Sequence, residues 1–85
     1  MVSSEDFTKA HKEIMKAIIE DLNSKPYTTI NKIREKTNHS RIVISRVIGV
    51  LLAMDVLDLD IVGRAKLIFK GKQWDRIYSL IDDSN

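Results

Sequence analysis

Positively charged side chains are concentrated in two segments of the 85-residue chain. Residues 25–54 carry six lysines and arginines against a single acid, Glu35, which gives a net charge of +5. Residues 64–72 carry four basic residues and no acid, although the net charge of the whole chain is only +2. Ammonium and guanidinium groups bind phosphate oxygens, and a guanidinium can also hydrogen-bond the edge of a guanine. The distribution of charge therefore favours a surface that contacts nucleic acid.

Residue patterns that would indicate catalysis or a bound cofactor are missing from the sequence. There is no cysteine, and no cluster of histidine, aspartate and glutamate has the spacing of metal ligands. No nucleophile–base pair, phosphate-binding loop or dinucleotide-binding fingerprint is present. We therefore expect no enzyme activity, no metal site and no cofactor.

The elements that must position the basic residues begin with a helix predicted at about 4–23. Apolar residues recur through it at helical spacing, and Ser3 or Ser4 can cap its first turn. Pro26 ends the pattern, because the residue before a proline disfavours helix. The next stretch, YTTI at residues 27–30, suits a short strand or a cap for the following helix.

Two further helices are predicted with a tight turn between them, at about 29–37 and 41–54. Asn38 tolerates the left-handed backbone that such a turn requires, and Ser40 is a good N-cap for the third helix. The inward face of the third helix would carry Ile44, Val47, Ile48, Leu51 and Leu52. Two short helices joined in this way are the elements of a helix-turn-helix.

A β-hairpin is predicted at about 56–70, where the period of apolar residues changes from helical to two. With a three-residue connection at 63–65, one face becomes wholly apolar, and Asp58 lies opposite Lys70 on the other. The apolar cross-strand pairs would be Leu59 with Phe69 and Ile61 with Leu67. A two-residue connection would mix acidic and apolar residues, so we expect the three-residue turn.

A last helix is predicted at about 72–82, with apolar residues at positions i, i+3, i+4 and i+7. The whole chain, residues 1–85, is expected to form one domain, mainly α with a small β-hairpin. The predicted order is helix, short strand, helix, helix, strand, strand, helix.

One stretch within this order, TNHSRIVISRVIGVLLAMDVL at residues 37–57, resembles small prokaryotic transcriptional regulators of the MarR and ArsR kind. Ile44, Ser45 and Arg46 match the Val-Ser-Arg of their pattern, and LIFKGKQW looks like their last wing strand and its exit into a final helix. The resemblance covers about residues 8–80. It implies a winged helix-turn-helix fold, and it leaves open whether the host is a bacterium, an archaeon, a plasmid or a virus.

The resemblance also implies which residues contact DNA. In these regulators the second helix of the pair lies in the major groove and the wing reaches phosphates or the minor groove. Arg41, Ser45 and Arg46 would then be the polar residues of the recognition helix, and Arg64 would lie at the tip of the wing. Contacts to the DNA backbone would come from Lys32, Lys36, Ser40, Lys66 and Lys70.

The expected partner is double-stranded DNA, bound by a homodimer that regulates transcription. A single small winged helix binds DNA weakly, and a two-fold assembly doubles its footprint. The candidate dimerisation residues are the apolar members of the last helix, which exceed what a three-helix core requires: Trp74, Ile77, Tyr78 and Ile81. No signal-peptide pattern and no apolar run of about 18 residues occurs, so we expect a cytoplasmic protein outside the membrane.

An alternative remains open from the sequence. The recognition helix departs from the regulators at Ile42 and Val43, where they place serine and threonine, and Val50 is a third apolar residue on its outer side. These three residues could instead dock the domain on another protein of a larger assembly. The two clusters of positive charge favour DNA.

Overall fold

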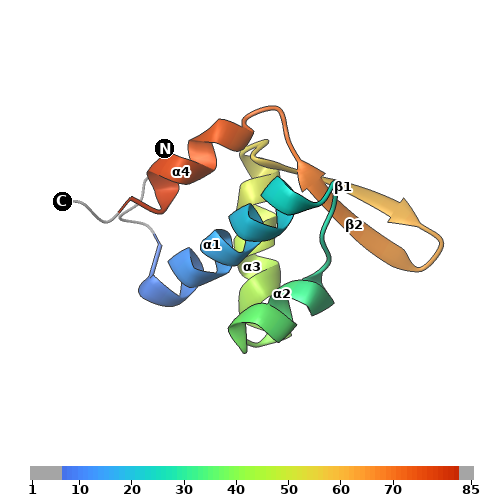
Figure 1. The fold of residues 1–85 in the computed structure, drawn as a ribbon, viewed down its shortest axis with the longest axis horizontal. Helices are drawn as coiled ribbons and strands as arrows, with labels where there is room; N and C mark the ends of the chain where they lie inside the picture. The colour runs from blue at the N-terminus through green and yellow to red at the C-terminus, as the bar shows by residue number, and fades with distance from the viewer. Residues whose placement is uncertain (1–6, 83–85) are drawn as a thin grey trace.

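The computed structural model of the protein describes residues 7–82. Its elements are α1 (Lys9–Ser24), α2 (Ile30–Thr37), α3 (Arg41–Ala53), β1 (Leu57–Val62), β2 (Ala65–Lys70) and α4 (Ile77–Leu80), with a short 3-10 helix at Trp74–Arg76. Figure 1 shows the helices gathered at one end of the molecule and the hairpin of β1 and β2 projecting away from them. The fold is thus mainly helical with one antiparallel hairpin, as the sequence predicts.

A capping box sets the start of α1. Thr8 Oγ1 accepts a hydrogen bond from the backbone N–H of His11, and His11 Nδ1 accepts one from the N–H of Thr8. The helix therefore begins at Lys9, and the predicted start near residue 4 is wrong. Ser3 and Ser4, the caps expected from the sequence, lie outside the described residues.

The turn between α2 and α3 follows the expected chemistry. Asn38 has a φ of 60°, and Ser40 caps α3 by accepting a hydrogen bond from the N–H of Val43. At the far end of α3, Asp55 also has a φ of 60°. Asparagine and aspartate enter this left-handed region more readily than other non-glycine residues, so both positions are explained by local chemistry.

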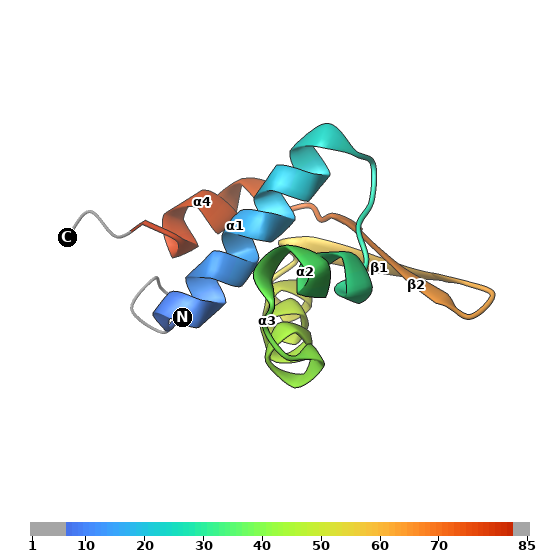
Figure 2. The ribbon, with the colours of Figure 1, turned by 60° about the horizontal axis from the view of Figure 1, so that its bottom comes forward.

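The core lies where α1, α2 and α3 meet the base of the hairpin and α4. Its fully buried apolar side chains come from every one of these elements and include Ile14, Ile18, Ile33, Ile44, Leu51, Ile68 and Ile77. Figure 2 shows α1 and α4 on one side of the molecule and the hairpin extending from the other. Only the base of the hairpin enters the core, so the strands beyond Leu57 and Ile68 are largely exposed.

This exposure explains why the predicted hairpin register is wrong. Val62 pairs with Ala65, so the connection has two residues, Gly63 and Arg64, and not three. Gly63 has a φ of +62°, which the first position of a type II′ turn requires and which matches the twist of the strands. A single wholly apolar face has little advantage along the part of the hairpin that projects beyond the core. The observed pairs are Asp58 with Phe69, Leu59 with Ile68 and Asp60 with Leu67.

The short strand predicted near residues 27–30 is reduced to one residue. Thr28 exchanges two backbone hydrogen bonds of 2.9 Å with Ile68 of β2, as an isolated bridge beside a two-stranded sheet. Pro26 has no N–H to pair, and Thr29 already caps α2, so only Thr28 is free to join β2. The expected three-strand order is therefore not found.

The last helix is shorter than the predicted 72–82. After β2, the N–H of Gly71 donates to the carbonyl of Val56 at 2.9 Å, and the N–H of Gln73 donates to the carbonyl of Asp55 at 2.7 Å. These bonds hold the chain against the start of β1, so it turns first into the 3-10 helix and only then into α4. No helix within residues 7–82 is long and apolar enough to cross a membrane.

Gly71 is predicted to be needed at this point. A Cβ there would press against the carbonyl of Asp55 and lie 2.9 Å from the carbonyl carbon of Leu57, so the backbone would have to move. We expect Gly71→Ala to lower the free energy of unfolding by about 1–3 kcal/mol in a urea titration. Gly49→Ala is the control, because no described atom beyond the neighbouring residues and backbone of its own helix lies within 4 Å of its Cβ position, and alanine in a helix should stabilise the fold slightly. Equal stability of Gly71→Ala and wild type would contradict the prediction.

Candidate nucleic-acid interface

The outer face of α3 is formed by its exposed residues, which lie on the side away from the core. They are Arg41, Ile42, Ser45, Arg46, Gly49, Val50 and Ala53. Of the three apolar residues whose direction the sequence left open, Val43 packs against the core. Val50 is 37% exposed, and Ile42 is 67% exposed. The outer face therefore presents one prominent apolar side chain between two arginines.

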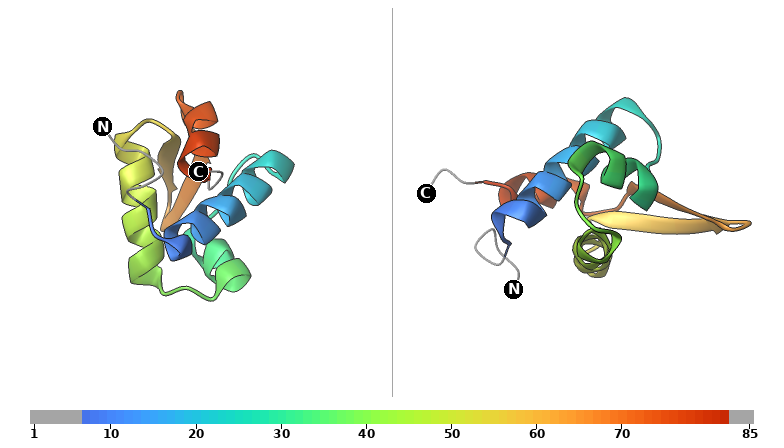
Figure 3. Two further views of the ribbon diagram at one scale, coloured as in Figure 1. Left: turned by 90° about the vertical axis from the view of Figure 1, so that its left-hand side faces the viewer. Right: turned by 90° about the horizontal axis from the view of Figure 1, so that it is seen from below.

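A hollow of about 460 Å³ lies where α2, α3 and the hairpin meet; we call it the α3–hairpin hollow. It is lined by Thr29, Ile30, Asn31, Arg41, Ser45, Arg64, Ala65 and Lys66. Figure 3 shows α3 nearly end-on in its right-hand view, with the hairpin extending beside it. Four residues predicted to bind DNA, from two different elements, thus meet on one surface. Among the residues that the structure describes, no acidic side chain lines the hollow.

The guanidinium of Arg41 is held in place by α2. Its Nη2 donates a hydrogen bond to Oδ1 of Asn31, which lies in the first turn of α2. This bond uses one of the five donors of the guanidinium and leaves the others for a ligand in the hollow. Sequence reasoning missed Asn31, since no spacing rule connects an amide in one short helix with the start of the next.

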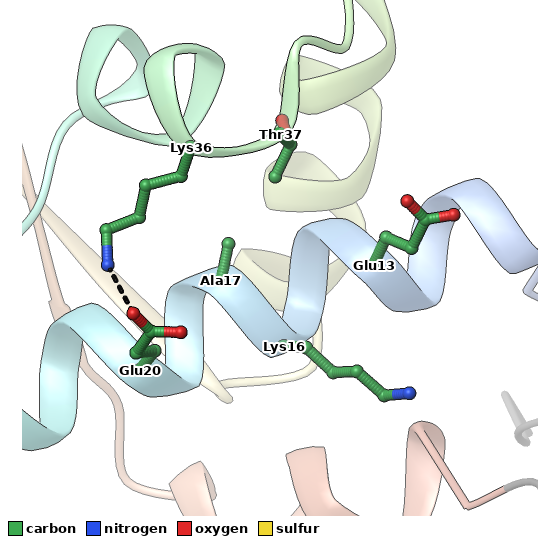
Figure 4. Close-up of a pocket in the computed structure, with 6 residues that line it drawn as sticks. All are labelled: Glu13, Lys16, Ala17, Glu20, Lys36 and Thr37. Atoms are coloured by element: carbon green, nitrogen blue, oxygen red, sulfur yellow. Dashed lines mark hydrogen bonds and ion pairs between the residues drawn. The ribbon is translucent and has the colours of Figure 1, made fainter.

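Lys36 occupies a different place from the one the sequence predicts. Its Nζ lies 2.9 Å from Oδ1 of Asp21 and 3.0 Å from Oε1 of Glu20, both on α1. Figure 4 shows it reaching across from α2 to Glu20. The hydrogen bonds to Asp21 and to Glu20 raise the pKa of the Lys36 ammonium, so it stays charged and bound to α1. Lys36 therefore links two helices of the scaffold and does not line the α3–hairpin hollow.

The remaining members of the predicted set lie around the hollow. Lys70 is at the base of the hairpin, where its Nζ lies 5.3 Å from the centre of the Trp74 ring in a cation–π contact. Lys32 is exposed on α2, and Arg46 is exposed on α3. Ser40 is exposed, and its hydroxyl caps α3. None of these four lines the hollow.

Two of the four candidate dimerisation residues belong to the core of the chain itself. Ile77 is fully buried, and Trp74 is 8% exposed. The expectation that all four exceed what the core requires is therefore wrong for these two, because the short α4 closes one side of the core. Tyr78 is 44% exposed and accepts a hydrogen bond from Asn23 Nδ2 at 3.3 Å, and Ile81 is partly buried.

Beneath the hollow, Thr28 connects the hairpin with α1. Its backbone pairs with Ile68 of β2, and its buried hydroxyl donates to Asp21 Oδ2 at 2.6 Å. Burial of Asp21 would raise the pKa of its carboxyl group, but the hydrogen bonds from Thr28 and Lys36 outweigh burial and lower this pKa below its ordinary value. The ionised carboxylate of Asp21 thus holds both α2 and the strand residue Thr28 against α1. The sequence suggested no role for Asp21, which lies among the charged residues near the end of α1.

No protein-family model and no curated protein matches the sequence. The fold, in contrast, is similar to solved structures at low sequence identity. The DNA-binding protein BpsR of Bordetella bronchiseptica, which 6-hydroxynicotinic acid regulates, aligns with a TM-score of 0.65 and 16% identity over 86% of this chain and 51% of BpsR. MarR of Staphylococcus aureus, solved with salicylate and kanamycin, aligns with a TM-score of 0.66 and 14% identity over 91% of this chain and 51% of MarR.

A third similar structure includes nucleic acid. TubR from Bacillus thuringiensis serovar israelensis, bound to 24 bp of tubC, aligns with a TM-score of 0.59 and 17% identity over 81% of this chain and 73% of TubR. The present chain spans about half the length of BpsR and of MarR. The chain therefore has the fold of a MarR-like winged helix-turn-helix domain.

Proposed function

We propose that the protein binds double-stranded DNA and regulates transcription, as a homodimer in the cytoplasm of a prokaryotic host. The observation that carries this proposal is the α3–hairpin hollow, in which Arg41 of α3 meets Arg64 and Lys66 of the hairpin without an acidic neighbour among the described lining residues. Two elements that present cations to one concave surface fit the curved, uniformly negative surface of a duplex. The likeness of the fold to TubR, which was solved bound to 24 bp of tubC, also supports DNA as the ligand.

In the proposed complex, the outer face of α3 enters the major groove. Arg46 and Ser45 then face the base edges, and Arg46 can donate two parallel hydrogen bonds to a guanine. Arg41 bonds a phosphate at the edge of the groove, because its guanidinium is held by Asn31 of α2 on the lining of the α3–hairpin hollow. Lys32 lies near the start of α2 and Ser40 at the start of α3, and both contact the DNA strand whose phosphate Arg41 bonds.

The hairpin contributes the second set of proposed contacts. Arg64 at its tip enters the adjacent minor groove or bonds a phosphate there, and Lys66 lies behind it along the hollow. Lys70 contributes less in this arrangement, because it lies over Trp74 at the base of the hairpin. Lys36 is left out of the proposed interface, because its ammonium is bound to α1.

A homodimer is proposed because one small domain makes few phosphate contacts. Tyr78 and Ile81 remain as the exposed and partly buried members of the predicted dimerisation set. Analytical ultracentrifugation of the wild type measures the oligomeric state directly. A monomer at all concentrations would remove the dimer from the proposal and leave DNA binding to be judged separately.

The proposal predicts strongly salt-dependent binding to mixed-sequence duplex DNA. Binding should weaken steeply between about 50 and 200 mM salt, because each phosphate contact releases counterions and contributes about −0.9 to the slope of log K against log salt. Arg64→Ala should make this slope about one unit shallower. Fluorescence anisotropy with a labelled duplex gives the slope for each variant.

Arg76→Ala is the matched control for this titration. Arg76 is an exposed arginine in the 3-10 helix and does not line the α3–hairpin hollow. Its removal lowers the net charge by the same amount, so a slope as shallow as that of Arg64→Ala would show that only total charge matters. If the wild type shows no salt-dependent binding, the protein does not act on DNA.

One observation favours a second candidate function. Ile42 is 67% exposed and Val50 is 37% exposed on the outer face of α3, and apolar side chains there could dock the domain on another protein. In that case the protein would be a winged-helix subunit of a larger assembly. The absence of binding in the salt titration would favour this candidate over the first.

A further inference from the structure

Ile42 is the most exposed large apolar side chain in the described part of the chain, at 67%. It lies in the first turn of α3, one residue after Arg41 and one helical turn before Arg46. Single exposed apolar residues are common on proteins and need no function by themselves. The side chains that surround Ile42, however, indicate a role for it.

The surface around Ile42 is cationic. No acid occurs in the sequence between Glu35 and Asp55, so the two arginines beside Ile42 have no acidic neighbour on their own helix. Two turns further along α3, no described atom beyond the neighbouring residues and backbone of the helix itself lies within 4 Å of the Cβ position of Gly49. A ligand can therefore approach the helix backbone closely below Ile42.

A ligand that suits this surface must offer one apolar group between anionic edges. The major groove of DNA has this form, because phosphates line both sides and the 5-methyl group of thymine is the apolar group on its floor. A protein partner would need to bring acidic side chains on both sides of an apolar contact, whereas every DNA duplex offers anionic edges on both sides of its major groove.

We propose that Ile42 reads thymine, through contact between its side chain and the 5-methyl group in the major groove. The inference rests on the proposed DNA binding and names the base that the first turn of α3 prefers. Burial of one methyl group corresponds to about 0.8 kcal/mol, which is about fourfold in affinity. Ile42 thus replaces a hydrogen-bonding residue as a source of sequence preference.

The test uses deoxyuridine, which pairs like thymine but lacks the methyl group. A duplex is first enriched from a random-sequence pool by binding to the wild type, and a copy is synthesised with every thymine replaced by deoxyuridine. Both duplexes are titrated with wild type and with Ile42→Ala. We expect the wild type to bind the deoxyuridine copy at least about fourfold more weakly, and Ile42→Ala to bind the two duplexes equally.

Ile61→Ala is the matched control, because Ile61 is 60% exposed and lies on the hairpin, outside α3. The Ile61→Ala variant should show the same ratio of affinities for the two duplexes as the wild type. The hairpin is proposed to approach the minor groove, where the 5-methyl group of thymine is not exposed. Both residues are exposed, so neither substitution should impair folding, and a urea titration verifies this.

Four results would overturn the inference. Equal affinity of the wild type for the two duplexes would remove thymine reading while leaving DNA binding intact. A difference that persists in Ile42→Ala would assign it to another residue. Conversion of a wild-type dimer to a monomer by Ile42→Ala, seen by ultracentrifugation, would show that Ile42 binds a second copy of the chain. If no duplex is bound at all, the proposed function fails together with this inference.

Discussion

Replacing Arg41 and Arg64 together with alanine is expected to weaken binding to duplex DNA by at least about thirtyfold. Each arginine that bonds a phosphate or a base contributes about 1–3 kcal/mol, so the pair contributes about 2–6 kcal/mol. The two side chains come from α3 and from the tip of the hairpin, and they line the same hollow. Loss of both side chains removes one proposed contact from α3 and one from the tip of the hairpin. Fluorescence anisotropy at one fixed salt concentration measures the change in Kd.

The control for this variant is Arg34→Ala with Arg76→Ala. Both arginines are exposed and neither lines the α3–hairpin hollow, so the control loses the same charge from elsewhere on the surface. It should change Kd by much less than the double variant in the hollow. Equal losses would mean that the protein attracts DNA by total charge, and the hollow would then not be the binding surface.

Asp21→Ala is expected to lower the free energy of unfolding by about 2–4 kcal/mol. Asp21 is 1% exposed, and its carboxylate accepts hydrogen bonds from the buried hydroxyl of Thr28 and from the ammonium of Lys36. Alanine leaves the hydroxyl without a partner, which costs about 1–3 kcal/mol, and it removes a charge-assisted hydrogen bond as well. Urea unfolding measured by circular dichroism gives the difference.

The neighbouring residue provides the control. Glu20 also binds Lys36, at 3.0 Å, but it is 77% exposed. Exposed ion pairs contribute about 0–1 kcal/mol, so Glu20→Ala should be nearly as stable as the wild type. If the two alanine variants are equally stable, the buried position of Asp21 has no special importance.

The same carboxylate makes stability depend on pH in a defined direction. Because the pKa of Asp21 is lower in the folded state than in the unfolded state, its contribution is complete above the unfolded pKa of about 3.9. The contribution is lost as pH falls below about 4 and the group becomes protonated. Asp21→Asn keeps an acceptor for Thr28 but cannot ionise. The difference in stability between wild type and Asp21→Asn should therefore shrink from neutral pH toward pH 3.

The cluster around Asp21 is also expected to affect the proposed binding surface. Thr28 joins β2 through its backbone and α1 through its hydroxyl, so Asp21 indirectly fixes the hairpin relative to the helices. A variant that loosens this link leaves Arg64 and Arg41 in the chain but no longer at one fixed distance. We therefore expect Asp21→Ala to weaken DNA binding, although Asp21 does not line the α3–hairpin hollow.

Local features of the fold could be predicted from the sequence, because they depend on a few neighbouring residues. The turn at Asn38 and the cap at Ser40 are examples, since each follows from the backbone preference or the hydroxyl of one residue. The inward face of α3 is another, because helical periodicity alone determines which side chains share a side. The winged helix-turn-helix itself followed from the order of such elements and from the residues around Ser45 and Arg46.

Features that depend on the burial of distant segments could not be predicted in this way. The hairpin register depended on how little of the hairpin enters the core, and the length of α4 on hydrogen bonds that tie Gly71 and Gln73 back to the start of β1. Trp74 and Ile77 belong to the core, although the sequence predicts them to exceed what the core requires. A sequence does not show how many apolar side chains are needed to close a core.

The candidate site likewise has some features that the sequence predicts and others that depend on the tertiary structure. Sequence by itself determined which segments are basic and that α3 carries apolar residues on its outer side. Only the tertiary structure decided which cations meet: Arg41, Arg64 and Lys66 at one hollow, and Lys36 at the carboxylates of α1. The physical reason is that charge is a property of single residues, whereas the ligand that a charge can reach depends on contacts between elements far apart in the chain.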